Sequence, residues 1–137
     1  VLVQEMVNGG IEMILGIHND QQFGPVVLCG FGGILAELLH DVSIRLCPVG
    51  ERDAREMVSE LKAASVLKGY RGEPARDLEG VIGLIVALSR LACDLMPEMV
   101  QTVDINPLMV FDKGKGVKAV DALIVTPASD EIRVYVV

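Results

Sequence analysis

Hydrophobic positions in the middle of the chain recur with the spacing of helices. After Asp53, which together with Glu56 resembles a helix-capping arrangement, apolar residues return every three or four positions. A second such run follows Asp77, a suitable N-terminal cap, and ends at Pro97, which cannot continue a helix. The expected apolar stripes are Ala54, Met57, Val58, Leu61 and Ala64 in the first helix, and Leu78, Val81, Ile82, Ile85, Leu88, Ala92 and Leu95 in the second.

Short runs rich in β-branched residues lie on both sides of these helices and predict strands. The order of strands, two helices and strands is typical of an α+β fold, with an antiparallel sheet covered on one side by the helices. Ile34 to Leu39 could be helix or strand, since periodicity does not distinguish them. We expect one domain over residues 1–125, with residues 126–137 forming a tail or an extra strand. The expected strands are Val1 to Val7, Ile11 to Ile17, Val26 to Cys29, Val42 to Leu46, Thr102 to Phe111, Val117 to Val125 and Ile132 to Val137.

Composition narrows the class of protein. The chain is 51% hydrophobic, yet it lacks the roughly 20-residue uncharged stretch of a membrane span, so the excess indicates a surface that another part of a larger protein covers. A net charge of -7 with scattered basic residues argues against nucleic acid as a partner. Three cysteines without CxxC spacing favour reduced thiols in a cytoplasmic protein. The chain opens on Val1-Leu2-Val3 without a leader, as expected for a domain cut from a longer polypeptide.

Asp104, Asn106 and Asp121 form a candidate metal site. Asp104 and Asn106 are two residues apart on one expected strand and therefore point to the same face, while Asp121 lies on the next strand of a hairpin. Two carboxylates and an amide oxygen are ligands that suit Mg²⁺. Pro107 removes a backbone donor, so the strand is at an edge or interrupted there. The alternative is that both aspartates are solvent-facing residues of a half-exposed hairpin.

The glycine-rich loop Gly30-Phe31-Gly32-Gly33 follows an expected strand. Glycine permits positive φ and close approach of the backbone to a ligand, so Gly30, Gly32 and Gly33 are candidates for contact with phosphate. A tight turn without any ligand would also require glycines, and the loop alone does not separate these readings.

Taken in order, several motifs resemble the ATP-grasp domain of ADP-forming acyl-CoA synthetases, a group related to the β subunit of succinyl-CoA synthetase. The similarity runs from about Val1 to Val125 and implies the C-terminal lobe of that domain. The motifs are Glu12-Met-Ile-Leu-Gly16, Phe23-Gly-Pro-Val-Val27, Gly30-Phe-Gly-Gly33, Glu37, Asp41-Val-Ser-Ile-Arg45, Pro48, Leu67-Lys-Gly-Tyr-Arg-Gly72, Asp104-Ile-Asn-Pro-Leu108 and Val120-Asp-Ala122.

The resemblance implies roles for individual residues in binding ATP or ADP with Mg²⁺. The hinge segment Gln4, Glu5, Met6 and Val7 would hold the adenine, and Glu12 would accept hydrogen bonds from the ribose hydroxyls. Asn106 and Asp121 match the magnesium ligands, while Asp104 replaces a Glu that is often found there and has a shorter reach. Arg45 and Glu37 are candidate catalytic residues, for which an exposed salt bridge and a helix-face carboxylate are the alternatives. Neither His18 nor His40 matches a phosphohistidine position of the family.

The implied function is an acid–thiol ligase that converts a carboxylic acid, CoA and ATP into acyl-CoA, ADP and phosphate. An N-terminal ATP-grasp lobe and CoA-binding and ligase domains would be supplied in cis or by a partner subunit, and we expect this chain alone to be inactive. Homo-oligomer formation is left open. A competing reading is a degenerate regulatory or sensor domain fused to an acetyltransferase. An ATP-grasp ligase with an amine acceptor fits the glycine loop and the Asp104 motif less well.

Overall fold

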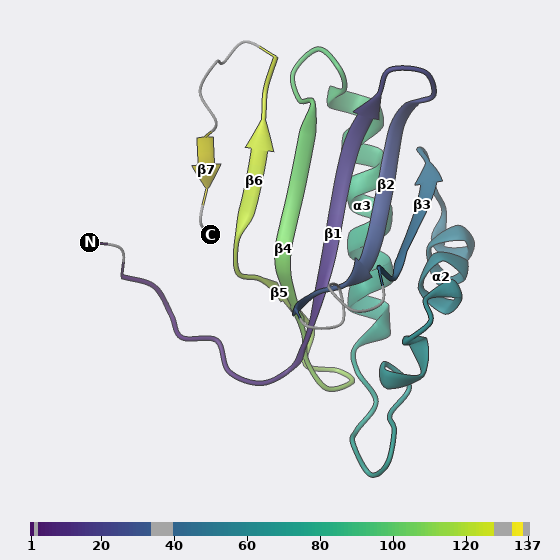
Figure 1. Cartoon of the computed structure of the whole chain (residues 1–137), viewed down its shortest axis with the longest axis vertical. Helices are drawn as coiled ribbons and strands as arrows, with labels where there is room; N and C mark the ends of the chain where they lie inside the picture. Colours follow the sequence, from purple (N-terminus) through teal and green to yellow (C-terminus); the bar gives the residue numbers. More distant parts are fainter. Residues whose placement is uncertain (2, 34–39, 128–132, 136–137) are drawn as a thin grey trace.

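The computed structural model describes residues 1, 3–33, 40–127 and 133–135. Its centre is an antiparallel sheet in the order β3-β2-β1-β4-β6-β7, with β5 paired to β4 beside β6 (Figure 1). The first three strands form a meander, and β4 returns after the helices to pair with β1. The strands are β1 (Ile11–Asp20), β2 (Gly24–Phe31), β3 (Val42–Leu46), β4 (Thr102–Val110), β5 (Val117–Ala119), β6 (Ala122–Val125) and β7 (Arg133–Tyr135).

The two long helices lie on the same face of the sheet. These are α2 (Glu51–Glu60) and α3 (Leu78–Leu95), connected through the short 3-10 helix η1 (Ala64–Val66), and α3 runs behind β1 and β2 in Figure 1. No helix of the described part of the chain is long and apolar enough to cross a bilayer. The prediction of an α+β fold with an antiparallel sheet and two helices on one side is confirmed.

The hydrophobic core fills the space between the sheet and the helices. Because side chains alternate along a strand, every second residue of β1 and β2 points to the helices and is buried. The buried stripe of α3 matches the predicted one at five positions, while Leu78 and Leu95 are partly buried. The core strand residues are Met13, Leu15, Ile17, Val27, Cys29 and Phe31, and the buried positions of the helix are Val81, Ile82, Ile85, Leu88 and Ala92.

The opposite side of the sheet carries the remaining strand residues, and we call it the open face. It presents Glu12 and His18 from β1 and Asp104 from β4, and both long helices are on the other side. Large apolar side chains on this face are exposed, among them Val42, Ile44 and Leu46 of β3 at 48 to 55%. The open face is therefore the surface available for binding.

The helix boundaries correct one prediction and support another. Helix α2 begins at Glu51 with Gly50 as its cap, so Asp53 is not the capping residue. It lies in the first turn and accepts a hydrogen bond from the Gly50 amide at 3.1 Å. The second helix does begin after Asp77, whose carboxylate accepts from the Gly80 amide at 3.1 Å, and it ends at Leu95, two residues before Pro97.

Two predicted strands differ from the observed ones. The prediction of a strand over Val1 to Val7 was wrong, because residues 1 and 3–7 have no strand and Met6 is 79% exposed. The predicted strand Val117 to Val125 is divided into β5 and β6 by Val120 and Asp121. The predicted segment Ile34 to Leu39 lies outside the described residues.

The ladder between β4 and β1 is irregular at Pro107, whose carbonyl accepts a hydrogen bond from Val120 in the gap between β5 and β6. Met13 of β1 pairs with Leu108 and Leu15 pairs with Ile105, so two residues of β4 stand opposite one residue of β1. Pro107 has no amide hydrogen to give to the ladder, and this is where the register shifts. The predicted interruption at Pro107 is therefore observed, in an interior strand rather than at an edge.

Candidate functional site

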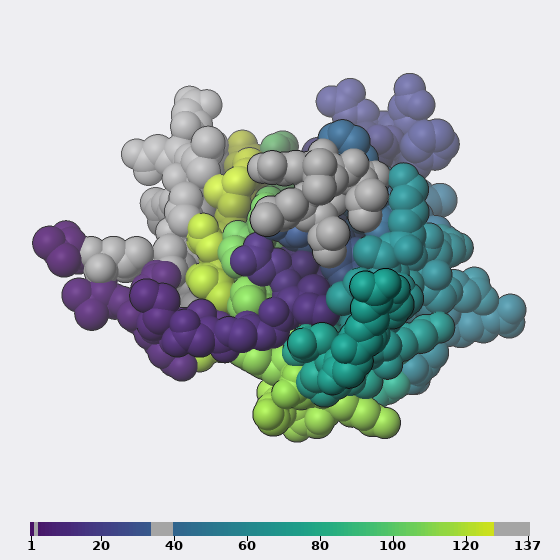
Figure 2. All heavy atoms as spheres, turned by 60° about the horizontal axis from the view of Figure 1, so that its bottom comes forward, coloured from purple at the N-terminus to yellow at the C-terminus, as the bar shows by residue number. Residues whose placement is uncertain are grey.

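The predicted hinge segment lies at one end of the sheet, beside β5. Gln4, Glu5 and Val7 line a shallow pocket together with Lys118, Ala119 and Val120. Figure 2, which brings this end forward, shows the purple N-terminal segment running beside the yellow-green residues of the C-terminal strands. The Lys118 ammonium forms an ion pair with the Glu5 carboxylate. Gln4, Glu5 and Met6 are exposed and Val7 is half-buried, and the segment is not a strand.

Glu12 lies at the same end of the open face and meets the glycine loop. The Gly32 amide donates to the Glu12 carbonyl at 2.8 Å. Gly33 has φ of +57°, and a Cβ at Gly33 would lie 2.7 Å from Oε2 of Glu12. The positive φ favours glycine at position 33, and a side chain there would have to displace the Glu12 carboxylate. The structure brings together Glu12, Gly32 and Gly33, as the prediction of a shared nucleotide site requires.

Gly30 differs from the other two glycines of the loop. It is buried in β2, where an added Cβ would lie 2.6 Å from the Asp41 carbonyl and 2.7 Å from a Val42 methyl. At this position the backbone of β2 lies against residues at the start of β3, and no open space for a ligand is left. The geometry accounts for Gly30 by strand packing, and only Gly33 of the three is exposed.

Met109 lies between Glu12 and Lys118, a position that was not identified from the sequence. In the sheet register, Glu12 of β1 is opposite Met109 of β4, and Met109 is opposite Lys118 of β5. These three side chains form a continuous row across the open face next to the hinge pocket. Met109 adds an apolar, adaptable surface to a row that otherwise carries charged groups.

The predicted metal ligands come together further along the open face. Asp104 pairs with Gly16 of β1. The backbone N–H of Asn106 donates to the backbone carbonyl of Asp121 at 3.1 Å. Partial burial and, second, the charge of Asp121 raise the pKa of Asp104, so the two carboxylates are close enough to interact. Asn106 and Asp121 are exposed and Asp104 is half-buried.

This oxygen-only set fits a divalent cation. Two carboxylates that repel each other, with an amide beside them, are stabilised by a positive ion, and Mg²⁺ takes its remaining ligands from water and phosphate. In the described part of the chain no three His, Cys, Asp or Glu side chains gather as a metal site, so the corner formed by Asp104, Asn106 and Asp121 supplies two acidic ligands rather than a full cage. Such a partial set suits a metal that a bound nucleotide also coordinates.

The two predicted catalytic residues do not join this group. Arg45 forms an ion pair with Glu60 of α2 and donates to the Ser43 hydroxyl at 3.3 Å and to the Ile44 carbonyl at 3.0 Å. Those partners draw its guanidinium to the helix side of β3, away from Asp104, in agreement with the salt-bridge alternative. Glu37 lies outside the described residues.

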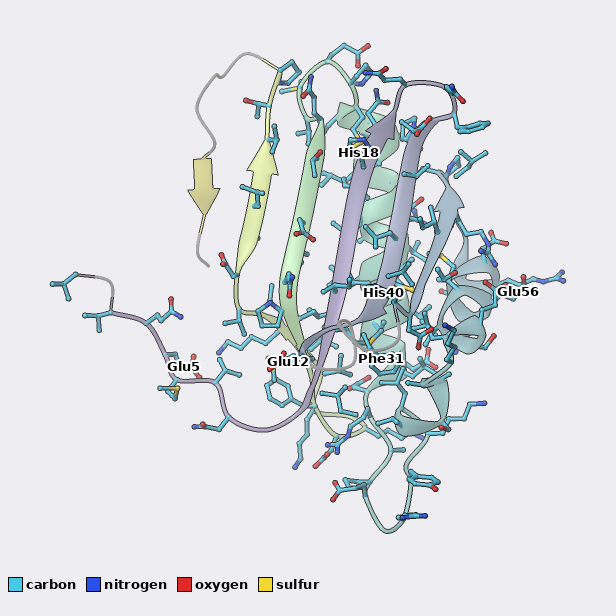
Figure 3. All side chains as sticks on the ribbon, viewed as in Figure 1. Glu5, Glu12, His18, Phe31, His40 and Glu56 are labelled. Carbon is cyan, nitrogen blue, oxygen red and sulfur yellow. The ribbon has the colours of Figure 1, made fainter. Side chains whose placement is uncertain are left out.

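The two histidines lie at different places. His18 is on the open face near the hairpin end of β1, where its Nδ1 is 3.0 Å from the Thr102 hydroxyl. His40 is exposed, with φ of +45°, in the segment before β3. Figure 3 shows Glu12 and His18 at opposite ends of β1.

Comparison with known proteins shows what kind of chain carries this arrangement. The family model of the ATP-grasp domain matches residues 1–126. This chain belongs to the ATP-grasp family. Over 125 residues, the ATP-grasp chain is 41% identical to the β subunit of an ADP-forming acetate–CoA ligase II of Pyrococcus furiosus, covering 91% of this chain and 52% of that protein. It is 40% identical to an ADP-forming 4-hydroxybutyrate–CoA ligase of Nitrosopumilus maritimus over 90% of this chain and 18% of the relative.

A solved structure has the same fold. It is a dinucleotide-forming acetyl-coenzyme A synthetase 1 of Ca. Korarchaeum cryptofilum in complex with coenzyme A and Mg-AMPPCP, with its phosphohistidine segment pointing towards the nucleotide binding site. The TM-score is 0.82 at 38% identity, with 90% of this chain and 56% of that chain covered. The ATP-grasp chain thus spans about half the length of the P. furiosus subunit and less of the 4-hydroxybutyrate ligase.

Proposed function

We propose that this ATP-grasp chain binds Mg·ATP on the open face of its sheet, as the nucleotide-binding part of an ADP-forming acyl-CoA synthetase. The observation that carries the proposal is the order of groups along that face. The hinge pocket comes first, then Glu12 with Gly33, then the acidic corner of Asp104, Asn106 and Asp121. A base, a ribose and a metal-bound triphosphate follow one another in the same order.

At the base, the hinge segment and Met109 supply an apolar and backbone-lined surface. Met109 is the register partner of Lys118, which lines the hinge pocket, and it would pack on one face of the purine. The Glu5–Lys118 ion pair holds the hinge against β5. Glu12 would accept hydrogen bonds from the ribose hydroxyls, with Gly33 leaving its carboxylate room to do so.

At the triphosphate, Asp104, Asn106 and Asp121 would hold Mg²⁺. When bound, the ion would supply positive charge that stabilises the phosphates during phosphoryl transfer. The protein's part is to fix the position of that charge. Gly16, opposite Asp104, is buried beneath the Leu28 side chain. Gly32 orders the loop through its hydrogen bond to Glu12.

The complete reaction requires more than this chain. We propose that an N-terminal ATP-grasp lobe and CoA-binding and ligase domains join it in cis or in a partner subunit, and that the chain alone does not turn over substrate. The relatives are named for different acids, acetate and 4-hydroxybutyrate, so the proposed substrate is a carboxylic acid as a class. The exposed apolar side chains of the open face are the surface that further lobes would cover.

The assay is ADP formation from Mg·ATP in the complete synthetase, measured with and without CoA and with a series of carboxylic acids. The proposal expects ADP release that depends on both CoA and an acid, and none from the isolated chain. Tight nucleotide binding without any CoA-dependent turnover by the complete protein would favour the alternative function, a regulatory ATP-grasp module fused to an acetyltransferase.

A further inference from the structure

Cys47 and Cys93 lie close together on the helix side of the sheet, although they are far apart in the sequence. Cys47 directly follows β3, packs against the core, and its amide donates to the Pro25 carbonyl at 2.9 Å. Cys93 is an exposed residue in the last turn of α3. Both thiols are on the side of the sheet away from the open face, so a role for this pair is independent of the proposed function.

Ser89 of α3 is the common neighbour of the two thiols. Its fully buried hydroxyl accepts from the Val49 amide at 2.7 Å, which holds the segment after β3 against the helix. The same hydroxyl forms a hydrogen bond with the Cys47 thiol. Cys93 is four residues after Ser89, one helical turn away, with about 5 to 6 Å between their Cβ atoms. Because helical side chains lean toward the N-terminus of their helix, the Cys93 thiol is directed back toward Ser89 and Cys47.

The three cysteines of the chain differ in reactivity. Partial burial raises the pKa of Cys47, the Ser89 hydroxyl opposes that rise, and the nearby Cys93 thiol adds to it, so the two thiols are close enough to interact. Cys29 is fully buried in β2, and burial raises its pKa to about 12. Since the thiolate is the form that attacks a disulfide, Cys29 is inert in the folded protein. Cys93 is the accessible thiol, and Cys47 is the partner beside it.

We propose that Cys47 and Cys93 are a reversible redox pair, which a low-molecular-weight disulfide such as oxidised glutathione converts into a disulfide that ties the segment after β3 to α3. The Cys93 thiolate attacks one sulfur of the oxidant, whose S–S bond breaks, and the first small thiolate leaves and takes up a proton. The Cys47 thiolate then attacks the Cys93 sulfur and expels the second small thiolate, which is protonated in turn. Two protein thiols are oxidised and one small disulfide is reduced to two thiols, so an excess of small thiol reverses the reaction.

The experiment treats the complete synthetase in its folded state with oxidised glutathione, blocks free thiols by alkylation and maps the tryptic peptides without reduction. Trypsin separates the two thiols into residues 46–52 and 91–113, and Cys29 falls in a third peptide. We expect the peptides of Cys47 and Cys93 to be linked, the link to disappear with dithiothreitol, and Cys29 to be alkylated only after unfolding.

Variants test the order of the two steps. Cys93→Ser should abolish the link. Cys47→Ser should leave a stable glutathione adduct on Cys93, because no second thiol expels it. The matched control combines Cys93→Ser with Ala87→Cys, which moves the exposed thiol to another side of the same helix. It should take up glutathione without linking to Cys47.

Hydrogen–deuterium exchange gives a second readout, since the link should slow exchange of the amides in residues 46–52 relative to the reduced protein. Three results would overturn the pair: a link to Cys47 in the Ala87→Cys control, a glutathione adduct that persists on Cys93 of the parent without reaching Cys47, or a link that forms only in urea. Unchanged or faster exchange in the linked protein would overturn the claim that the disulfide ties this segment to α3.

Discussion

Asp104 of β4 faces Asp121, the residue between β5 and β6, and the pKa of Asp104 lies above its ordinary value because of partial burial and, second, the charge of Asp121. An ionised Asp104 is thus disfavoured by the fold itself. Arrangements that cost stability and bring acidic oxygens together are typical of functional sites.

Asp104→Asn should therefore raise the melting temperature of the metal-free protein at neutral pH. A raised folded-state pKa means that the stabilising contribution is present below the unfolded-state value and is lost as pH rises through the folded-state value. Asparagine does not titrate, so the gain over the parent should appear as pH rises through that window and vanish at lower pH. The same variant should lose the thermal stabilisation by Mg·ATP. A variant that is less stable at neutral pH would contradict the account of this pair.

Glu12→Gln tests the ribose position. The charged acceptor becomes a neutral one, and we expect ATP affinity to fall about fivefold to tenfold. The affinity for 2′,3′-dideoxy-ATP, which has no hydroxyls to donate, should change little. Glu98→Gln, at an exposed position after α3, should affect neither nucleotide. If Glu12→Gln weakens both nucleotides equally, Glu12 does not bind the ribose.

Gly33→Ala should separate backbone strain from loss of the site. The φ of Gly33 is +57° and that of Gly114 is +84°, so alanine is strained at both, by about 1 to 2 kcal/mol. Only at Gly33 does the new Cβ meet the Glu12 carboxylate, whereas Gly114 has open space around it. Both variants should unfold at lower urea concentration, and only Gly33→Ala should also weaken ATP binding. Matching ATP affinities for the two variants would argue against a role of this contact.

Ser89→Ala tests how the segment between β3 and α2 is attached to α3. The fully buried Ser89 hydroxyl accepts a hydrogen bond from the Val49 amide at 2.7 Å. Alanine leaves that amide without its partner, and we expect a loss of about 1 to 3 kcal/mol in the free energy of unfolding. Ser59→Ala, which removes an exposed hydroxyl of α2, should stay within about 0.5 kcal/mol of the parent in urea unfolding. Equal stability of the two variants would show that the buried hydrogen bond contributes little.

The layer architecture and the acidic corner could be predicted from the sequence because both depend on simple periodicity. Helical spacing identified the buried stripe of α3, and strand alternation placed Asp104 and Asn106 on the same side. The hairpin between β4 and β6 then brought Asp121 to them. The buried stripe of α3 and the pairing of β4 with β6 depend on local pattern and on one turn, and both are present in the structure.

Met109 could not be assigned to the open face by the same reasoning. Strict alternation from Asp104 would place residue 108 on that face, but the two-for-one register at Pro107 exchanges the faces, so Leu108 is buried and Met109 is not. Pro107 predicted that the strand is interrupted, but not that the register of β4 against β1 shifts by one residue. Likewise, Arg45 near a glycine loop resembled a phosphate ligand, while its partner Glu60 lies 15 residues away on α2, a contact that only the packed fold creates.

The most direct test of nucleotide binding on the open face is the magnesium dependence of ATP affinity in Asp121→Ala. Equilibrium binding to the complete synthetase would be measured with excess Mg²⁺ and with a chelator, with Asp94→Ala on the exposed side of α3 as the matched control. We predict that magnesium strengthens ATP binding in the parent and in Asp94→Ala, and that Asp121→Ala loses about tenfold or more of that gain. An Asp121→Ala protein whose magnesium-dependent affinity equals that of the parent would contradict the assignment of the site.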